Sequence, residues 1–331
     1  MIDIALDGRA LSREEMARVF EDLVTGGIAP ERVEAFLVAL SARGETVDEL
    51  VGAATVMRRH VTDILCPDPD AIDTCGTGGD GISTFNVSTA AAIIAAGAGA
   101  TVAKHGNRTN TRASGSAEVL TALGVNIDAP SQVVERCLRE VRIGFLFAAK
   151  LHPVMGNVVA IRRRIGRPTI FNYVGPLTNP ARVRRQIIGV PREELVDKIA
   201  AALCELGVVQ GFVVHGGDGL CDLTVTTTSL CAEIRDGRVR TYEVAPEEAG
   251  LARSSLSSLL VSGPGESAEA IRAILRGQRG PRRDHALMNA AIALMAAGIA
   301  GNLRHGAKEA AESIDSGRAQ AVLDGLVRLT N

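Results

Sequence analysis

After residue 70 the sequence alternates short apolar runs rich in β-branched residues with longer stretches of helical periodicity. Helical patterns lie at about 89–97, 131–141 and 194–206, and again from about 266 to 329. Apolar strands separated by helices indicate a mostly parallel sheet covered on both faces, so the predicted fold class is α/β. The candidate strands are TVAKH (101–105), GFLFAA (144–149), TIFNY (169–173), QIIGV (186–190) and GFVVHG (211–216).

The first sixty residues have a different pattern, with three amphipathic helices on tight turns. Ser12 with Glu15 and Thr46 with Glu49 have the spacing of capping boxes, and Pro30 opens the helix between them. We expect the apolar faces of these helices to form a core, with an interface to a second subunit as the alternative. The turn-rich segment CPDPD then breaks the pattern, which predicts a helical domain over 1–66 and an α/β domain over 70–331.

The composition of the 331 residues limits the class of protein. Hydrophobic residues make up 46% and charged residues 22%, which is enough apolar material for a packed core. The net charge of −2 argues against a nucleic-acid binder, because such proteins neutralise phosphates with an excess of basic residues. No apolar run is long enough to span a bilayer, and the N-terminal segment has no basic start followed by an apolar core. We therefore expect no membrane partner and a cytoplasmic location, with the six scattered cysteines as reduced thiols.

The segment from Gly76 to Ser116 carries the strongest indication of chemistry. It begins with four glycines within six residues, and glycines at this density let backbone N–H groups surround an anion. Asn86, Ser88 and Thr89 follow immediately before the run AAAIIAA, and Ser88 or Thr89 is expected to cap that helix. The N-terminus of such a helix presents free N–H donors and the positive end of its dipole. The segment therefore predicts a site for a diphosphate.

The same glycines also match GxGxxG, a pattern that is found in dinucleotide-binding proteins. That pattern expects an acidic residue about 20 positions on, for the ribose hydroxyls. No Asp or Glu occurs from Gly81 to Ala117, where Lys104, His105, Arg108 and Arg112 stand instead. The base-rich stretch favours a ligand richer in phosphate than a nicotinamide cofactor. A tight turn followed by solvated basic residues is the alternative interpretation without a ligand.

Several motifs of this chain resemble those of the anthranilate phosphoribosyltransferase family. They are GTGGD (76–80), NVST (86–89), KHGNR (104–108), HPVM (152–155), FNYVGPLTNPA (171–181) and VVHGGDGL (213–220). The resemblance covers nearly the whole chain. It implies an Mg²⁺-dependent enzyme of tryptophan biosynthesis that joins anthranilate to phosphoribosyl pyrophosphate and releases pyrophosphate. It also implies a homodimer that pairs through the helical domain, and a helical segment near 175–185 that joins this domain.

The resemblance assigns roles to individual residues, none of them a nucleophile, since displacement at the ribose carbon needs charge stabilisation and positioning. The implied acceptor positions are Gly76, His105, Asn107, His152, Arg162 and Pro176. A guanidinium such as that of Arg162 suits the carboxylate of anthranilate. Ser88 is an implied metal ligand. The implied donor-binding residues are Gly76, Gly79, Asp80, Thr84, Asn86, Val87, Ser88, Thr89, Lys104, His105, Gly106, Asn107, Arg108, Thr111 and Ser116.

The chain departs from the family at the second metal-binding position. Where the family has Asp followed by Glu, this chain has Cys221 and Asp222. Mg²⁺ prefers oxygen ligands, and a thiol is a poor replacement for a carboxylate. Asp218 lies close in sequence as a partial substitute. The open interpretations are one metal ion fewer or a metal held through pyrophosphate and water, a different aromatic amine as acceptor, and weak catalysis.

Three other functions remain as alternatives to the transferase. A paralogue would use another aromatic acceptor, and a related nucleoside phosphorylase would handle free phosphate. A non-catalytic relative would bind nucleic acid on the same fold. The KHGNR segment and Arg162 favour the transferase over the phosphorylase, and the net charge disfavours the nucleic-acid binder.

Overall fold

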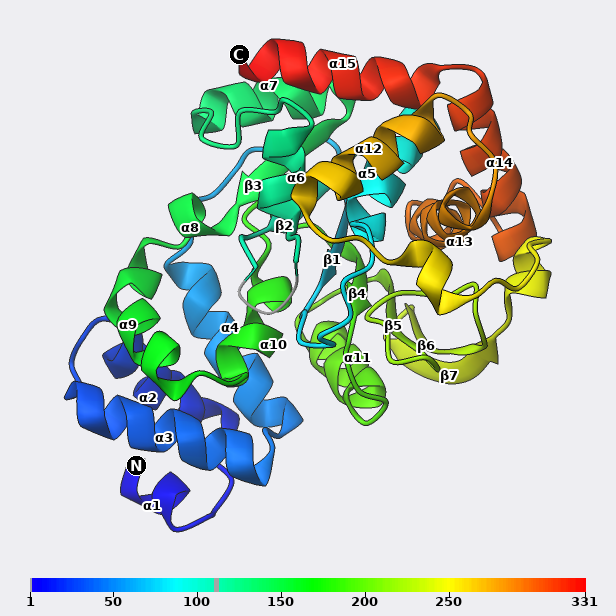
Figure 1. The fold of residues 1–331 in the computed structure, drawn as a ribbon. Coiled ribbons are helices and arrows are strands. Elements are labelled where there is room, and N and C mark those ends of the chain that lie inside the picture. The colour runs from blue at the N-terminus through cyan, green and yellow to red at the C-terminus, as the bar shows by residue number, and fades with distance from the viewer. Residues whose placement is uncertain (1, 110–112) are drawn as a thin grey trace.

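The computed structural model describes residues 2–109 and 113–331 and contains a helical domain followed by a larger α/β domain (Figure 1). The α/β domain is built on one seven-stranded sheet in the order β3-β2-β1-β4-β5-β6-β7. The strands are β1 Ile72–Gly76, β2 Val102–Gly106, β3 Ile143–Phe147, β4 Arg185–Gly189, β5 Gln210–Gly216, β6 Ser229–Arg235 and β7 Arg238–Val244. The pairs from β3 through to β5 are parallel, and β6 and β7 pair antiparallel. The predicted fold class is confirmed.

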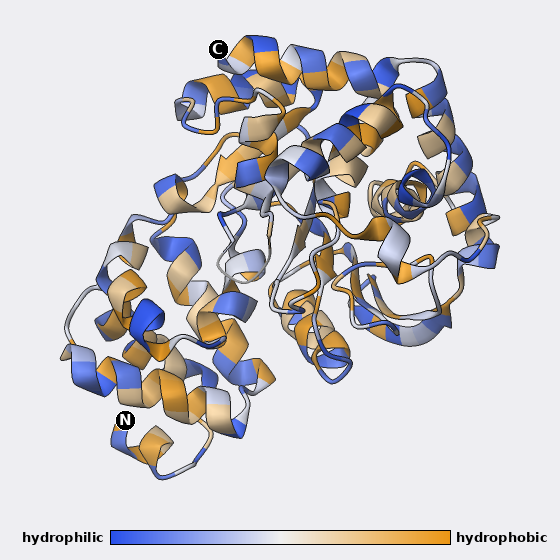
Figure 2. Cartoon of the chain, viewed as in Figure 1, coloured by the Kyte–Doolittle hydropathy of each residue, from blue (hydrophilic) through white to orange (hydrophobic). Residues whose placement is uncertain are grey.

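The helical domain contains the three predicted helices, preceded by a short one. Its helices are α1 Ile2–Leu6, α2 Arg13–Val24, α3 Pro30–Arg43 and α4 Val47–Arg59. Both predicted capping boxes are present. The side chains of Ser12 and Thr46 each accept the backbone N–H of the glutamate three residues later, and the carboxylate of that glutamate accepts the backbone N–H of the cap residue. Most of the large apolar residues of these helices are buried, and Phe20 and Phe36 are fully buried. Figure 2 shows polar and apolar faces along the same helices.

The helices that follow β1 cover both faces of the sheet, and two of them pack on the helical domain instead. They are α5 Val87–Gly97, α6 Ser116–Ala122, α7 Ser131–Val141, α8 Ala148–Leu151, α9 Gly156–Ile165, α10 Ile170–Val174, α11 Leu195–Glu205, α12 Pro264–Leu275, α13 Pro281–Ala296, α14 Leu303–Asp315 and α15 Arg318–Thr330, with 3-10 turns η1 Pro153–Met155, η2 Gly175–Thr178, η3 Pro246–Ala249 and η4 Leu256–Leu259. Successive strand residues point to opposite faces, so Ile187 packs in one core with α5 and α13 while Ile188 packs in another with α11. The second core continues into the helical domain, which joins the two domains through packed side chains.

The prediction of a strand at TIFNY (169–173) is wrong, because Ile170–Val174 is the helix α10. At its start the Thr169 N–H donates to Asn172 Oδ1 at 3.0 Å, and this local bonding outweighs the β-branched composition of the run. Helices α9 and α10 pack against α3 and α4 of the helical domain. The segment expected near 175–185 begins with the 3-10 turn η2, directly after α10. The acceptor positions Arg162 and Pro176 therefore lie where the two domains meet.

No helix among the described residues is both long and apolar enough to cross a membrane.

Candidate functional site

A cleft of about 310 Å³ lies at the carboxyl ends of β1 and β2, where the glycine-rich loop leaves the sheet. Gly78, Gly79 and Gly81 have φ angles of 64°, 94° and 69°, which residues with a side chain rarely adopt. The loop thus folds tightly between β1 and α5 and leaves its backbone facing the cleft. Ligands of open α/β sheets bind at this edge of the sheet.

The helix α5 begins at Val87, so its N-cap is Asn86 and the prediction that Ser88 or Thr89 caps it is wrong. Ser88 lies in the first turn and lines the cleft. The Asn86 side chain makes no cap bond and instead accepts the hydroxyls of Ser114 at 2.6 Å and Ser267 at 2.8 Å. The first turn of α5 therefore keeps donors for a ligand, while Asn86 fastens the turn to two other segments.

Lys104 extends from β2 into the floor of the cleft. Its Nζ donates to the Thr74 carbonyl at 2.5 Å and lies 3.3 Å from Ser88 Oγ. Burial lowers the pKa of Lys104, and the carboxylates of Asp73 and Asp222 act in the opposite direction. A buried ammonium beside the N-terminus of a helix is a strong site for a negatively charged group.

The end of β2 and the start of α6 form the next wall. Gly106 has no room for a Cβ because Ser116 Oγ and the Phe145 ring occupy that space. Ser116 Oγ donates to the Asn107 carbonyl at 3.2 Å, and the guanidinium of Arg108 lies 5.6 Å from the centre of the Phe147 ring. This close packing brings Asn107, Arg108 and Ser116 to one side of the cleft.

Arg162 lines the opposite side, on α9. Its guanidinium lies 5.4 Å from the centre of the Phe171 ring and donates to Asn172 Oδ1 at 3.3 Å. Burial lowers its pKa, although the group stays charged because guanidinium is a very strong base. These contacts hold the planar cation against an aromatic wall, with room in the cleft for a planar carboxylate.

His105 and His152 form a buried pair behind this wall, with their Nε2 atoms 3.1 Å apart. Burial lowers the pKa of His105 to about 3 and that of His152 to about 4. Both rings are therefore neutral near pH 7, and one donates its N–H to the other. The pair supplies a polar but uncharged lining.

Cys221 and Asp222 close the remaining side. A Cβ at Gly189 would overlap the Cys221 carbonyl, so this glycine of β4 allows the segment to lie directly on the sheet. The Cys221 N–H donates to Asp80 Oδ2 at 3.2 Å, and both Cys221 and Asp222 line the cleft. Asp218 is turned into its own loop, where it accepts the hydroxyls of Thr224 at 2.7 Å and Thr226 at 2.6 Å.

Two family models match this chain. One, described as the a/b domain of a glycosyl transferase family, matches residues 68–320, and the other, described as the helical bundle domain, matches residues 1–61. The anthranilate phosphoribosyltransferase of Anaeromyxobacter sp. (strain K) is 48% identical over 325 residues, which cover 98% of this chain and 96% of the relative. The chain belongs to the anthranilate phosphoribosyltransferase family.

Solved structures of this family have the same fold. The crystal structure of anthranilate phosphoribosyltransferase from Thermus thermophilus aligns with a TM-score of 0.93 at 38% identity, over 99% of this chain and 98% of that one. The enzyme from Saccharomyces cerevisiae in complex with PRPP and Mg aligns with a TM-score of 0.87 at 30% identity, over 97% and 93%. The yeast enzyme in complex with 4-fluoroanthranilate aligns with a TM-score of 0.86 at 29% identity, over 97% and 93%.

Most of the predicted site residues of this family member line the single cleft: Gly76, Gly79, Asn86, Val87, Ser88, Lys104, His105, Gly106, Asn107, Arg108, Ser116, Arg162, Pro176, Cys221 and Asp222. Asp80 lies on a neighbouring hollow, Thr84 bridges to Leu260, and Thr89 is fully buried beneath the first turn of α5. His152 lies behind His105. Thr111, like Arg112, falls outside the described residues.

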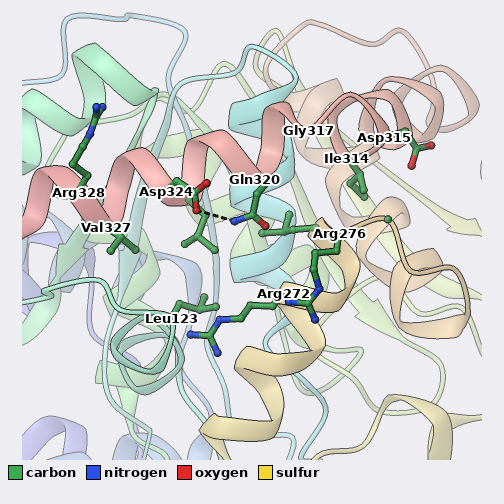
Figure 3. Close-up of a pocket in the computed structure, with 13 residues that line it drawn as sticks. Leu123, Arg272, Arg276, Ile314, Asp315, Gly317, Gln320, Asp324, Val327 and Arg328 are labelled. Atoms are coloured by element: carbon green, nitrogen blue, oxygen red, sulfur yellow. Dashed lines mark hydrogen bonds between the residues drawn. The ribbon is translucent and has the colours of Figure 1, made fainter.

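Sequence reasoning missed several residues of the cleft, of which Phe171 and Asn172 are the most informative. They lie in the run predicted as a strand, although the spacing of Thr169 and Asn172 is a recognisable sign of a helix start. A larger hollow of about 790 Å³ lies between α12, α14 and α15 (Figure 3). It contains none of the predicted site residues, and Asp324 and Gln320 on its rim bond to each other at 2.8 Å.

The buried histidines predict how stability depends on pH. The pKa of His152 is about 4 in the native protein against an ordinary value of 6.5, so below pH 6.5 only the unfolded state takes up the proton. Native stability should therefore fall as the pH drops from 6.5 toward 4. From pH 7 to pH 5 the protein should lose about 2 kcal/mol more unfolding free energy than a His152→Asn variant.

Urea unfolding at the two pH values measures this difference. His305→Asn is the matched control, because His305 is exposed, and it should behave like the unchanged protein. Equal losses in the unchanged protein and the His152→Asn variant would contradict the assignment of a neutral buried ring.

Proposed function

We propose that this protein transfers the phosphoribosyl group of phosphoribosyl pyrophosphate to the amine of anthranilate and releases pyrophosphate, as a step of tryptophan biosynthesis. The observation that carries the proposal is that the glycine loop, Lys104 and Arg162 face one cleft in a chain of this family. The relative named anthranilate phosphoribosyltransferase matches this chain over 96% of its own length. The yeast structures of that family hold PRPP in one case and 4-fluoroanthranilate in another.

The residues of the cleft divide into a donor side and an acceptor side. Loop amides, the first turn of α5 and Lys104 suit a diphosphate, on which negative charge grows as the bond to ribose breaks. Arg162 and Asn107 suit the carboxylate and amine of an aromatic acceptor, and the Phe171 ring supports the guanidinium. Catalysis then consists of holding the amine in line with the ribose carbon while the leaving diphosphate is stabilised.

Ser88 and Asp222 are oxygen donors that fit a Mg²⁺ ion beside the diphosphate. Among the described residues no three or more His, Cys, Asp and Glu side chains form a group that could hold a metal ion. The protein would therefore supply a partial ligand set, with diphosphate oxygens and water as the other ligands. When bound, the ion neutralises charge on the leaving group.

The fluorescence of anthranilate tests the proposed function. Protein, Mg²⁺ and phosphoribosyl pyrophosphate should consume anthranilate, with the signal falling as product forms. Binding of the donor without loss of fluorescence would instead indicate a paralogue with another aromatic acceptor. Dependence on inorganic phosphate would indicate a phosphorylase.

We also propose that the protein is a cytoplasmic homodimer paired through the helical domain. All six cysteines are reduced thiols, which suits a reducing compartment. Leu6 on α1 and Val159 on α9 are large apolar residues that stay exposed, at 41% and 44%. Both helices pack on α3, so these side chains are available for a second copy on the helical domain. Sedimentation should give twice the mass of the chain, and a monomer would contradict the pairing.

Arg162 provides a test of the acceptor side. The Arg162→Ala variant should raise KM for anthranilate by about ten- to a hundredfold, because it removes a charged hydrogen-bond donor. Affinity for the donor should change little, since Arg162 lies across the cleft from Lys104 and the glycine loop.

The neighbouring Arg163 is exposed and offers the matched control, Arg163→Ala, which should leave both constants unchanged. Equal effects of the two substitutions on anthranilate KM would remove Arg162 from the acceptor site.

Because a thiol is a poor ligand for Mg²⁺, Cys221 should raise the Mg²⁺ concentration that the enzyme requires. Replacing Cys221 with Asp supplies the carboxylate that the family has at this position, next to Asp222 in the cleft. The Mg²⁺ concentration for half-maximal activity should fall several-fold, because a hard cation gains an oxygen ligand.

Cys221→Ala separates loss of the thiol from gain of a carboxylate and should leave the magnesium requirement as it is. An unchanged requirement in Cys221→Asp would mean that position 221 does not reach the metal.

A further inference from the structure

The pairing of β1 with its two neighbours is unequal. β1 and β4 pair along all five residues, from Ile72 with Arg185 to Gly76 with Gly189. Between β1 and β2 the only paired positions are Ile72 and Val102. The two strands therefore separate toward their carboxyl ends, where the cleft lies.

Side chains bridge this separation. Asp73 Oδ1 accepts the backbone N–H of His105 at 2.9 Å, and Lys104 Nζ donates to the Thr74 carbonyl at 2.5 Å. The backbone groups that strand pairing would have satisfied are thus satisfied by one carboxylate and one ammonium.

Asp73 also reaches the segment that follows α10. Its Oδ2 accepts Asn179 Nδ2 at 2.7 Å and Gln186 Nε2 at 3.4 Å. The Asn179 amide donates in addition to the Ala103 carbonyl at 2.9 Å and accepts the Ala181 N–H at 2.8 Å. Gln186 Nε2 donates to the Pro176 carbonyl at 2.8 Å.

This carboxylate is fully buried, so its position is fixed by these donors. Burial raises its pKa, while the bonds from Asn179 and His105 and the charge of Lys104 act in the opposite direction. A buried carboxylate of this kind is costly unless every lone pair finds a donor. The donors come from β2, from the segment after η2 and from β4, and two of them lead directly to His105 and Pro176.

We propose that Asp73 is a positioning residue for the acceptor side of the cleft. It does not line the cleft itself. It sets the distance between the end of β2, which carries His105 and Asn107, and the η2 segment, which carries Pro176. The expected change in anthranilate KM rests on the proposed function. The hydrogen bonds of Asp73 are features of the structure and do not depend on which reaction the protein catalyses.

The test compares Asp73→Asn with the unchanged protein. Asparagine keeps an oxygen for the His105 N–H but turns an NH₂ group toward the NH₂ groups of Asn179 and Gln186, so donors face donors. KM for anthranilate should rise about tenfold or more, because the substitution removes one charged hydrogen bond that holds the acceptor side in place. The dissociation constant of phosphoribosyl pyrophosphate, measured by calorimetry, should stay within about threefold because the glycine loop and α5 are untouched.

Two further variants keep a loss of stability apart from a loss of positioning. Glu49→Gln neutralises another fully buried carboxylate that accepts backbone N–H groups, from Leu11 and Thr46, in the helical domain. It should lower stability without changing either constant. Asn179→Ala removes one donor, leaves the Asp73 bond to His105, and should also raise anthranilate KM.

Hydrogen exchange gives a readout that does not need the reaction. The His105 and Ala181 amides should exchange faster in Asp73→Asn and unchanged in Glu49→Gln. Unchanged exchange and unchanged anthranilate KM in Asp73→Asn would overturn the positioning role, as would equal losses on the donor and acceptor sides. If the protein without any substitution neither binds the donor nor consumes anthranilate, the proposed function is overturned instead.

Discussion

The separation of β1 from β2 is the constraint on which the rest of the site depends. The strands β1 and β2 share one paired position, at Ile72 and Val102, and the cleft lies at their carboxyl ends. Lys104 and Asp73 bridge the two backbones, and the charge of each favours the ionised form of the other. The glycine loop and the first turn of α5 then complete one side of the opening, and α9, α10 and η2 the other.

The sequence predicted the features that depend on neighbouring residues. The capping boxes at Ser12 and Thr46 and the strands β2 to β5 follow from local patterns of polarity and spacing, and they are confirmed. The strand β1 is not among the predicted strands. The strand prediction for TIFNY is wrong because five residues are too few to show a distinguishing period, and one capping bond from Thr169 decides the outcome. Asp73 has no signal in the sequence because its partner Asn179 is 106 residues away, a separation that no local pattern encodes. The hairpin of β6 and β7 does carry a recognisable signal, with Asp236 and Gly237 at its turn.

The departure from the family that the sequence predicts, at Cys221 and Asp222, lies on one side of the cleft. Asp218 does not line the cleft, and its two oxygens accept bonds within its own loop. The Cys221 backbone donates its N–H to Asp80 and lies with its carbonyl against Gly189.

We propose that the cleft between the glycine loop and Lys104 holds the phosphoribosyl pyrophosphate. Calorimetric titration of phosphoribosyl pyrophosphate into the protein, with and without Mg²⁺, tests it most directly. We expect one donor bound per chain, more tightly with Mg²⁺. Lys104→Ala should lose much of this affinity, because Lys104 is the only lysine among the described residues that line the cleft. Binding that is unaffected by Lys104→Ala, or no binding at all by the unchanged protein, would contradict it.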